Sequence, residues 1–327
     1  MGLTQSDMEK QKSVPTAVDS VALESLVRQV TSIRESFILL KILGSGSFGN
    51  VILVKDKQTG LERAAKELIK GSFDTSNFTL FLQELQVLKS LVKHIQDHPS
   101  VMRFFEVVET STRYYIISEY LSGGQLFERF SRSPIVNEKI AAKYMFDVVI
   151  ALNFCHKNGL SNKDIKPENL LFEFDAPDAH LKLVDYGFSL LKNFSTGAKG
   201  PVGSVVYMPP EKFKGEVSEK SDIWSVGVIL FIILSGRVPF QGKTDAETMQ
   251  KILNKPLSMN SKSWETVSEE AKSLVSSMLN KDPESRPTAE EIMMDPWFFA
   301  YTKNNISDAL FHPETVLNLA KYHVCII

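Results

Sequence analysis

Three glycines form the first group of residues whose spacing suggests chemistry. The segment Gly44-Ser45-Gly46-Ser47-Phe48-Gly49-Asn50-Val51 follows the pattern G-x-G-x-x-G-x-V. Such glycines let backbone amides approach the oxygens of a bound phosphate, because no side chain intervenes. The same spacing also opens the helix of dinucleotide-binding folds. Here an apolar run rich in β-branched residues follows at 51–54, so the sequence predicts a phosphate-binding loop between two strands.

A lysine and a glutamate downstream form the second candidate pair. Lys66 follows Val51 by 15 residues in the extended run Ala64-Ala65-Lys66, whose small residues could roof an adenine pocket. A strand lysine by itself is usually a solvated surface charge. Glu84 lies in residues 78–92, where apolar residues recur at three- and four-residue steps and predict an amphipathic helix. We expect Glu84 to pair with Lys66 and to hold its ammonium group against the phosphates.

The most specific pattern is Asn162-Lys163-Asp164-Ile165-Lys166-Pro167-Glu168-Asn169, followed 16 residues after Asn169 by Asp185-Tyr186-Gly187. Both match protein-kinase motifs, H-R-D-L-K-P-E-N and D-F-G, in spacing and in the charged positions that contact substrate or metal. From Phe37 to Ala300 the chain therefore resembles the eukaryotic-type serine/threonine protein kinases.

The resemblance implies transfer of a phosphoryl group from ATP, with Mg²⁺, to serine or threonine hydroxyls of protein substrates in intracellular signalling. It implies that Asp164 accepts the hydroxyl proton and that Lys166 supplies positive charge. Asn169, counted with the catalytic residues, and Asp185 would hold the metal. The nucleotide-binding residues that it implies are Leu43, Gly44, Ser45, Gly46, Ser47, Phe48, Gly49, Val51, Ala64, Lys66, Glu84, Ser118, Glu119, Leu121 and Leu171.

Further residues acquire structural roles from the same resemblance. Glu211, in Met208-Pro209-Pro210-Glu211, is expected to form a buried ion pair with Arg286. Asp222 is expected to accept hydrogen bonds from the backbone of the catalytic loop. Ser204 stands where serine/threonine kinases carry a hydroxyl that faces the catalytic aspartate.

The order of predicted elements is that of an α+β fold with the two lobes of a protein kinase. Strands dominate an antiparallel N-lobe with one main helix, and helical periodicity dominates after Gly123-Gly124, in residues 138–157, 222–234, 245–253, 268–279 and 289–294. We expect a hinge near 119–124. The predicted domains are a flexible N-terminal extension with a short helix in its apolar stretch 21–30 (1–36), an N-lobe (37–120), a mostly helical C-lobe (121–300) and a C-terminal extension (301–327).

Within the kinases, the chain most resembles the calcium/calmodulin-dependent group, and above all the plant and protozoan calcium-dependent kinases. Those enzymes carry calcium-binding loops after the kinase domain, but the sequence has no D-x-[DN]-x-[DN]-G loop. We therefore expect no direct calcium binding by this chain. Residues 301–327 resemble the start of a regulatory junction. The motifs behind this assignment are residues 123–129 (GGQLFER), 222–230 (DIWSVGVIL) and 234–240 (LSGRVPF).

Several positions depart from the kinase pattern. Asn162 and Tyr186 replace a histidine and a phenylalanine, and we expect the two new polar groups to hydrogen-bond each other. Lys163 replaces the arginine that reads a phosphorylated activation loop. The loop offers Ser189, Ser195 and Thr196 as phosphorylation sites, but we expect activity without that modification. Ser118 stands where a larger residue usually closes the pocket behind the adenine, and Gln125 replaces a glutamate that contacts ribose and substrate.

These departures leave two kinase-like functions open, and a third function of another class is disfavoured. An active kinase is favoured because Lys66, Glu84, Asp164, Lys166 and Asn169 are all present, together with the Asp185 metal ligand. The alternative is a pseudokinase scaffold that binds nucleotide or partners without efficient transfer. A dinucleotide-binding oxidoreductase conflicts with the strand after the glycine loop.

Composition narrows the setting. The net charge is −2, which gives no basic field for nucleic acid, and two cysteines are too few for a disulfide framework. We expect a cytoplasmic protein without nucleic-acid partners. The longest apolar run, 223–234, is too short to span a bilayer and predicts a buried helix.

Gly2 begins a myristoylation pattern that could give reversible membrane association. His94 and His98 have no third ligand nearby to make a metal site, and Cys155 is expected in the core.

Overall fold

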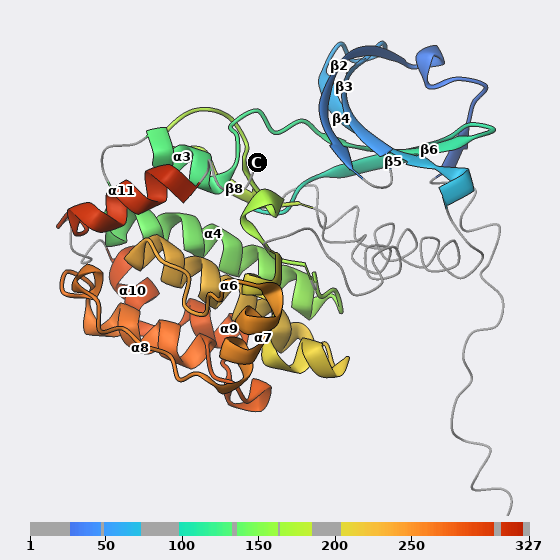
Figure 1. Ribbon diagram of the computed structural model, residues 1–327. Coiled ribbons are helices and arrows are strands. Elements are labelled where there is room, and N and C mark those ends of the chain that lie inside the picture. The colour runs from blue at the N-terminus through green and yellow to red at the C-terminus, as the bar shows by residue number, and fades with distance from the viewer. Residues whose placement is uncertain are drawn as a thin grey trace, which may run out of the picture. The chain divides into compact units, whose positions relative to one another are not determined.

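Residues 27–46, 49–72, 98–132, 136–162, 164–184, 204–303 and 309–322 are described by a computed structural model. The chain divides into two units, and the division falls between Ile117 and Ser118. Unit 1 contains Met1–Ser72 and Phe105–Ile117, whereas unit 2 contains Phe73–Phe104 and Ser118–Ile327. The described part of unit 1 is mainly sheet and that of unit 2 mainly helix, which confirms the predicted α+β fold (Figure 1).

The sheet of unit 1 curves strongly (Figure 1) and has the strand order β1-β5-β6-β4-β3-β2. Strands β2, β3 and β4 pair antiparallel, as the alternating sequence predicts. The bounds are β1 Val27–Gln29, β2 Phe37–Gly46, β3 Gly49–Asp56, β4 Glu62–Ile69, β5 Phe104–Glu109 and β6 Arg113–Glu119.

Strand β1 corrects two expectations. Residues Val27–Gln29 were part of the apolar stretch that predicted a helix, yet they form a strand parallel to β5, so the sheet is mixed and not wholly antiparallel. Arg28 donates to both carboxylate oxygens of Glu106 at 2.8 Å and to Ser36 Oγ at 2.7 Å. A short apolar run does not distinguish helix from strand, and here the partner strand decides.

One face of this sheet is covered by an apolar cluster. The 3-10 turn Ile33–Glu35 contributes Ile33, and its N-cap Ser32 and Glu35 form a capping box. Because alternate strand residues face opposite sides, this cluster leaves the other face of β3 and β4 for different contacts. The buried members of the cluster are Ile33, Phe37, Val54, Ala65, Val108, Tyr115 and Ile117.

The helices of unit 2 agree with the predicted periodic segments. Prediction and structure coincide at Glu138–Lys157 and differ by a few residues at the ends of the other predicted helices. The short helices α3, α10 and α11 were not predicted. The bounds are α3 Leu126–Arg132, α4 Glu138–Lys157, α6 Glu219–Ser235, α7 Asp245–Asn254, α8 Glu269–Met278, α9 Ala289–Met293, α10 Pro296–Thr302 and α11 Pro313–Tyr322, with a hairpin of β7 Leu170–Phe172 and β8 Leu181–Leu183.

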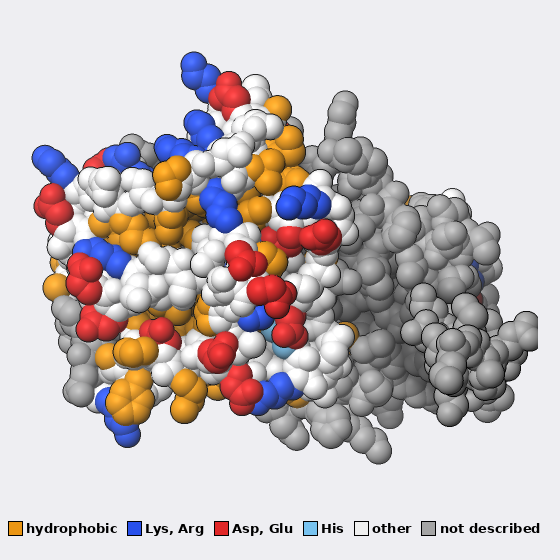
Figure 2. Space-filling view, turned by 90° about the horizontal axis from the view of Figure 1, so that it is seen from below, with side chains coloured by type: hydrophobic (Ala, Val, Ile, Leu, Met, Phe, Trp, Pro, Cys, Tyr) orange, Lys and Arg blue, Asp and Glu red, His pale blue; other side chains and the backbone are white. Residues whose placement is uncertain are grey.

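Helix α6 forms the centre of unit 2. Every residue from Ser221 to Ser235 is buried, which confirms that the apolar run is a buried helix. No helix in the described part of the chain is long and apolar enough to cross a membrane. Helix α4 packs against α6, and α11 packs against α3 and α6 (Figure 1). On the face of unit 2 shown in Figure 2, acidic and basic side chains are interspersed among exposed apolar groups.

A buried glutamate connects three of these helices. Glu138, 3% exposed at the start of α4, accepts hydrogen bonds from Ser268 N, Ser268 Oγ and Trp297 Nε1, each at 2.7 Å. Ser268 is the N-cap of α8 and Trp297 belongs to α10. The carboxylate thereby fixes the relative positions of α4, α8 and α10.

The expected ion pair between Glu211 and Arg286 is confirmed. Arg286 Nη1 and Nη2 donate to the two Glu211 carboxylate oxygens at 2.7 and 2.8 Å, and both residues are buried. Arg286 also donates to the carbonyls of Asn280 and Lys220, and Ser221 Oγ donates to Glu211. Burial raises the pKa of Glu211, but the hydrogen bonds from Arg286, from its own backbone amide and from Ser221, together with the positive charge of Arg286, outweigh burial and bring the pKa below its ordinary value.

We predict that Arg286→Met lowers the free energy of unfolding by about 3–5 kcal/mol at pH 7, because the Glu211 carboxylate is left buried without a cation. Urea unfolding measures the change. The matched control is Lys157→Met, which breaks an exposed pair with Glu290 and should cost less than about 1 kcal/mol.

The pH dependence of this difference has a definite sign. Because the folded-state pKa of Glu211 is lowered, its pair stabilises the fold above the unfolded value of about 4.3 and loses that effect as the pH falls through the folded value. The gap between the natural protein and Arg286→Met should therefore shrink below about pH 4.3. An unfolding difference that is constant from pH 7 to pH 3 contradicts this role.

Candidate functional site

The glycine loop of unit 1 joins two antiparallel strands, as predicted. Strand β2 ends at Gly46 and β3 starts at Gly49, and these two residues are paired in register. Gly49 has φ +142°, and a Cβ there would lie 2.3 Å from the carbonyl oxygen of Glu67. A side chain is therefore excluded at this position by both conformation and space.

The base of the loop is braced by polar side chains. Ser45 Oγ donates to Asn50 Oδ1 at 2.8 Å, and Asn50 Nδ2 donates to Glu67 Oε2 at 3.2 Å. Leu43, Gly44 and Ser45 are exposed. The described part of the predicted phosphate-binding segment, 44–46 and 49–51, thus lies within the β2–β3 pairing, next to residues 43–45 that are open to solvent.

Lys66 lies directly opposite Val51 in the β3–β4 pairing. Ala64 precedes Lys66 by two residues, so both project on the same face, whereas Ala65 is fully buried in the apolar cluster. The predicted nucleotide residues Val51, Ala64 and Lys66 are thereby brought together on the sheet face opposite that cluster.

In unit 2, three predicted catalytic residues come together within one loop. Lys166 Nζ lies 3.4 Å from Asp164 Oδ2, and both side chains are largely buried. Asn169 Nδ2 donates to the Asp164 carbonyl at 2.8 Å, and Asn169 N donates to the Lys166 carbonyl at 2.9 Å. The arrangement places a carboxylate, an ammonium and an amide oxygen within one short segment, 164–169, which closes with the 3-10 turn Pro167–Asn169.

The carboxylate of Asp222 holds the backbone at the start of this loop. Asp222 Oδ2, 1% exposed, accepts from the backbone amide of Asn162 at 2.8 Å and lies 3.0 Å from His156 Nε2. The expected contact between Asp222 and the loop backbone is therefore confirmed. His156, at the end of α4, was missed from the sequence, because nothing in its spacing to residue 222 indicates the contact.

Asn162 has a structural function of its own. Its Oδ1 accepts from the Asp164 amide at 3.2 Å, and the residue is 1% exposed. Asn162 Nδ2 is buried and finds no acceptor among the described residues. Because Tyr186 lies outside them, the hydrogen bond between Asn162 and Tyr186 stays a prediction.

The linker after β6 is attached to the β7–β8 hairpin by backbone hydrogen bonds. Ser122 N donates to Glu173 O at 3.1 Å, Gly123 N to Phe172 O at 3.0 Å, and Phe172 N to Gly124 O at 2.9 Å. A Cβ on Gly123 would lie 2.4 Å from the Phe174 carbonyl oxygen, so the linker approaches the hairpin closely.

The remaining predicted residues of the linker region are mostly buried. Ser118, Glu119 and Leu121 are 6%, 7% and 9% exposed. Leu171 on β7 forms an isolated bridge with Gln125 and pairs in register with Lys182 of β8. Sequence reasoning missed Lys182, a fully buried lysine, because alternation within β8 assigns it no role.

Several predicted residues cannot be placed. Outside the described residues lie four predicted site residues, Ser47, Phe48, Glu84 and Asp185. Also outside them are Lys163, the activation-loop candidates Ser189, Ser195 and Thr196, and the side chain of Ser204. Val184, the residue before Asp185, donates from its amide to the Asn169 carbonyl at 3.0 Å. The chain therefore contacts Asn169, the first predicted metal ligand, at the residue directly before Asp185, the second one.

The remaining sequence candidates have structural surroundings. Cys155 is buried, and burial, with a smaller contribution from Asp222, raises the pKa of its thiol to about 12. His98 Nδ1 accepts from Ser100 N, and its ring centroid lies 4.8 Å from that of Phe154, with the two rings tilted by 43°. Burial lowers the pKa of His98. No cluster of potential metal ligands occurs within the described ranges, and His94 lies outside them.

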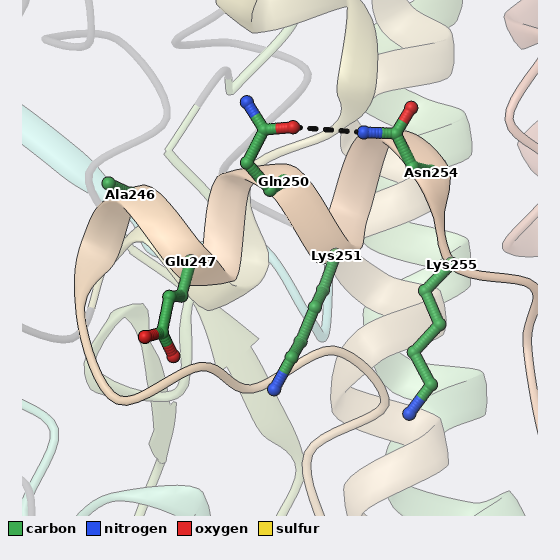
Figure 3. A pocket seen from close by; sticks show the side chains of 6 residues that line it. All are labelled: Ala246, Glu247, Gln250, Lys251, Asn254 and Lys255. Carbon is green, nitrogen blue, oxygen red and sulfur yellow. Dashed lines mark hydrogen bonds between the residues drawn. The ribbon is translucent and has the colours of Figure 1, made fainter.

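A shallow hollow runs along α7, away from every predicted site residue (Figure 3). Its polar side chains have local partners: Glu247 accepts from Lys243 N, Lys251 donates to Gln241 O, and Asn254 donates to Gln250. The lining residues are Ala246, Glu247, Gln250, Lys251, Asn254 and Lys255.

The comparisons with known proteins agree with this geometry. The family described as protein kinase domain matches residues 37–298. Calcium-dependent protein kinase 5 of Plasmodium falciparum (isolate 3D7) is 32% identical over 264 residues, which are 81% of this chain and 45% of the relative. The calcium and calcium/calmodulin-dependent serine/threonine-protein kinase of Pisum sativum is 35% identical, covering 75% of this chain and 46% of its own length.

Calcium-dependent protein kinase 24 of Oryza sativa subsp. japonica is 34% identical over 86% of this chain and 54% of the relative. The chain thus spans about half the length of these curated relatives. Because the family match covers most of the sequence, the chain belongs to the protein kinase family, and it is similar to the kinase part of calcium-dependent serine/threonine kinases.

Proposed function

We propose that this chain is an active kinase that transfers the γ-phosphoryl group of ATP to serine and threonine hydroxyls of protein substrates. The observation that carries the proposal is the joint placement of Asp164, Lys166 and Asn169 in one loop supported by Asp222. Preorganised charge of this kind is what phosphoryl transfer requires, since little covalent chemistry is left to the protein.

Each group has a definite task. Asp164 would accept the proton of the attacking hydroxyl, and the Lys166 ammonium, 3.4 Å from its carboxylate, would stabilise negative charge on the transferred group. In unit 1, the amides of loop 44–49 and the ammonium of Lys66 would bind the phosphates. The close approach of Gly49 to Glu67 excludes a side chain at position 49 of this loop.

The residues of unit 2 fit a magnesium ion. Asn169 uses its Nδ2 on the Asp164 carbonyl, which leaves the Oδ1 oxygen as a ligand beside the chain that leads to Asp185. Oxygen ligands are those that Mg²⁺ prefers, and the ion, when bound, would supply positive charge beside the phosphates. We therefore assign ATP and Mg²⁺ as cofactors, with Asn169 and Asp185 as the ligands.

The pseudokinase alternative rests on the exchange at Asn162 and its neighbours. In this structure Asn162 supports the loop, because its side-chain oxygen accepts from the Asp164 backbone amide and its backbone amide donates to Asp222. The departure from the family pattern therefore comes with hydrogen bonds that hold the backbone of the catalytic loop at Asn162 and Asp164, which favours activity.

Asp164→Asn should lower kcat by at least about 10²-fold, because the amide cannot accept the hydroxyl proton. The assay follows transfer of labelled phosphate from Mg-ATP to a generic protein substrate. The exposed Asp178→Asn makes the same chemical change outside the loop and should keep natural activity. Equal rates for the natural protein and Asp164→Asn would favour the scaffold alternative.

Ser118 should leave an open pocket beside the adenine. A purine-like inhibitor with a bulky aryl group is expected to inhibit the natural protein, and Ser118→Met should weaken inhibition more than about 10-fold while it spares ATP use, because the longer side chain fills that space. Inhibition constants for both proteins test this. Equal constants would show that residue 118 does not line the inhibitor pocket.

A cytoplasmic location with reversible membrane attachment through Gly2 is proposed from the sequence pattern alone. In cells that contain an N-myristoyltransferase, we expect a membrane-bound fraction that Gly2→Ala abolishes, since one acyl chain binds only weakly, with a constant of about 10⁴ M⁻¹. Fractionation with a mass measurement of the N-terminal peptide decides the matter. A membrane fraction that persists in Gly2→Ala contradicts the assignment.

A further inference from the structure

Lys182 is a buried lysine that the proposed reaction does not use. It lies in β8 with 2% of its side chain exposed, and its Nζ is 2.8 Å from Glu119 Oε1 and 3.7 Å from Glu173 Oε1. Burying an ammonium group is costly unless it is paired and hydrogen-bonded. The fold therefore retains this charge only together with the Glu119 carboxylate.

Glu119 is held from a second side as well. Its Oε1 also accepts from the Arg103 backbone amide at 2.7 Å, its Oε2 lies 3.4 Å from Arg103 Nε, and its own amide donates to the Arg103 carbonyl at 3.0 Å. The segment before β5 is in turn hydrogen-bonded to β8, since Met102 N donates to Leu183 O and Leu183 N to Ser100 O. Glu119 thus joins two neighbouring segments of unit 2 through one carboxylate.

The two ends of the linker are therefore fixed in different ways. From Ser122 to Gly124, backbone hydrogen bonds to the β7–β8 hairpin set its position. At Glu119, just after the division between the units, the side chain provides contacts to both β8 and Arg103. The Glu119 backbone is thus held by its own bond to the Arg103 carbonyl, and the Glu119 carboxylate adds a link from this point of the chain to Lys182.

We propose that Lys182 is a positioning residue for nucleotide binding, which fixes the 119–121 backbone against which the adenine lies. This inference rests on the proposed function, in which Glu119 and Leu121 bind the nucleotide. An apolar pair of similar size would stabilise the fold as well as an ion pair does, or better. A charged hydrogen bond, in contrast, fixes a distance and a direction, which a binding backbone needs.

Lys182→Met removes the ammonium but keeps an unbranched apolar side chain of similar length. Glu119 then keeps only Arg103, and its carboxylate should move toward water and draw the 119–121 backbone away. We expect the Kd for Mg-ATP and the KM for ATP to rise about 10- to 100-fold, the range for a lost charged hydrogen bond. We expect kcat within about twofold of natural and the KM for protein substrate unchanged, because the catalytic loop is not touched.

Three further variants sharpen the test. Lys182→Arg keeps the charge and should restore most of the ATP affinity. Lys182→Met combined with Glu119→Gln removes both charges and should bind Mg-ATP more tightly than Lys182→Met alone, since the carboxylate that has lost its lysine is replaced by a neutral amide. Lys157→Met breaks the exposed Lys157–Glu290 pair and should change nothing.

The preference for ATP over GTP is the readout that a purely structural role would not move. If Lys182 positions the base-binding backbone, Lys182→Met should lower the ratio of GTP Kd to ATP Kd, whereas general destabilisation would lower Tm and leave the ratio intact. Titration calorimetry with the full chain and Mg-ATP or Mg-GTP measures the affinities. Should Lys182→Met fail to fold, Glu119→Gln and the double variant give the same comparison.

The outcomes separate this inference from the proposed function. A folded Lys182→Met with natural ATP affinity and natural ATP preference overturns the positioning role, whatever the activity. Loss of kcat at unchanged KM overturns it too. A natural protein that binds Mg-ATP but transfers no phosphate rejects the proposed activity and leaves the binding comparison valid. If the natural protein binds no Mg-ATP, both fall.

Discussion

The buried carboxylate of Asp222 is the contact on which the predicted catalytic loop depends. It belongs to α6, the most deeply buried helix of unit 2, and it accepts from the Asn162 amide while it contacts His156 at the end of α4. A carboxylate can accept several hydrogen bonds at once, so one side chain joins a helix, a second helix and an irregular loop. The loop can therefore lack regular structure and still be held in one place.

The same solution recurs wherever unit 2 must fix segments that regular packing cannot align. Glu138 joins the starts of α4 and α8 to α10, Asp147 accepts from Ser100 and Leu181, and Glu211 binds Arg286 with both oxygens. Each carboxylate costs free energy to bury and recovers it only with all partners present. Such networks make the arrangement specific, because a shifted segment would leave a buried charge without a donor.

The sequence predicted what local pattern can encode. Helix α4 was found to the residue because its periodicity and its N-cap Asn137 agree, and the loop 164–169 was found because its charged residues are close in sequence. The strand Val27–Gln29 escaped prediction, since three residues carry little periodicity, and the short helices α3 and α10 escaped it as well. Helix α11 also escaped, although it has 10 residues, as many as α7. His156 and Lys182 escaped because their partners lie 66 and 63 residues away along the chain. Contacts of that kind are set by packing.

The attachment of the linker has a consequence for how this protein can diverge. Between Ser122 and Gly124 its path is fixed by main-chain hydrogen bonds to the hairpin, and the next residue, Gln125, takes its place through a backbone bridge to Leu171. Backbone hydrogen bonds form whatever the side chain of the residue is. Gln125 can thus stand where a glutamate is usual without moving the linker, and ligand preference can drift there while the scaffold stays the same.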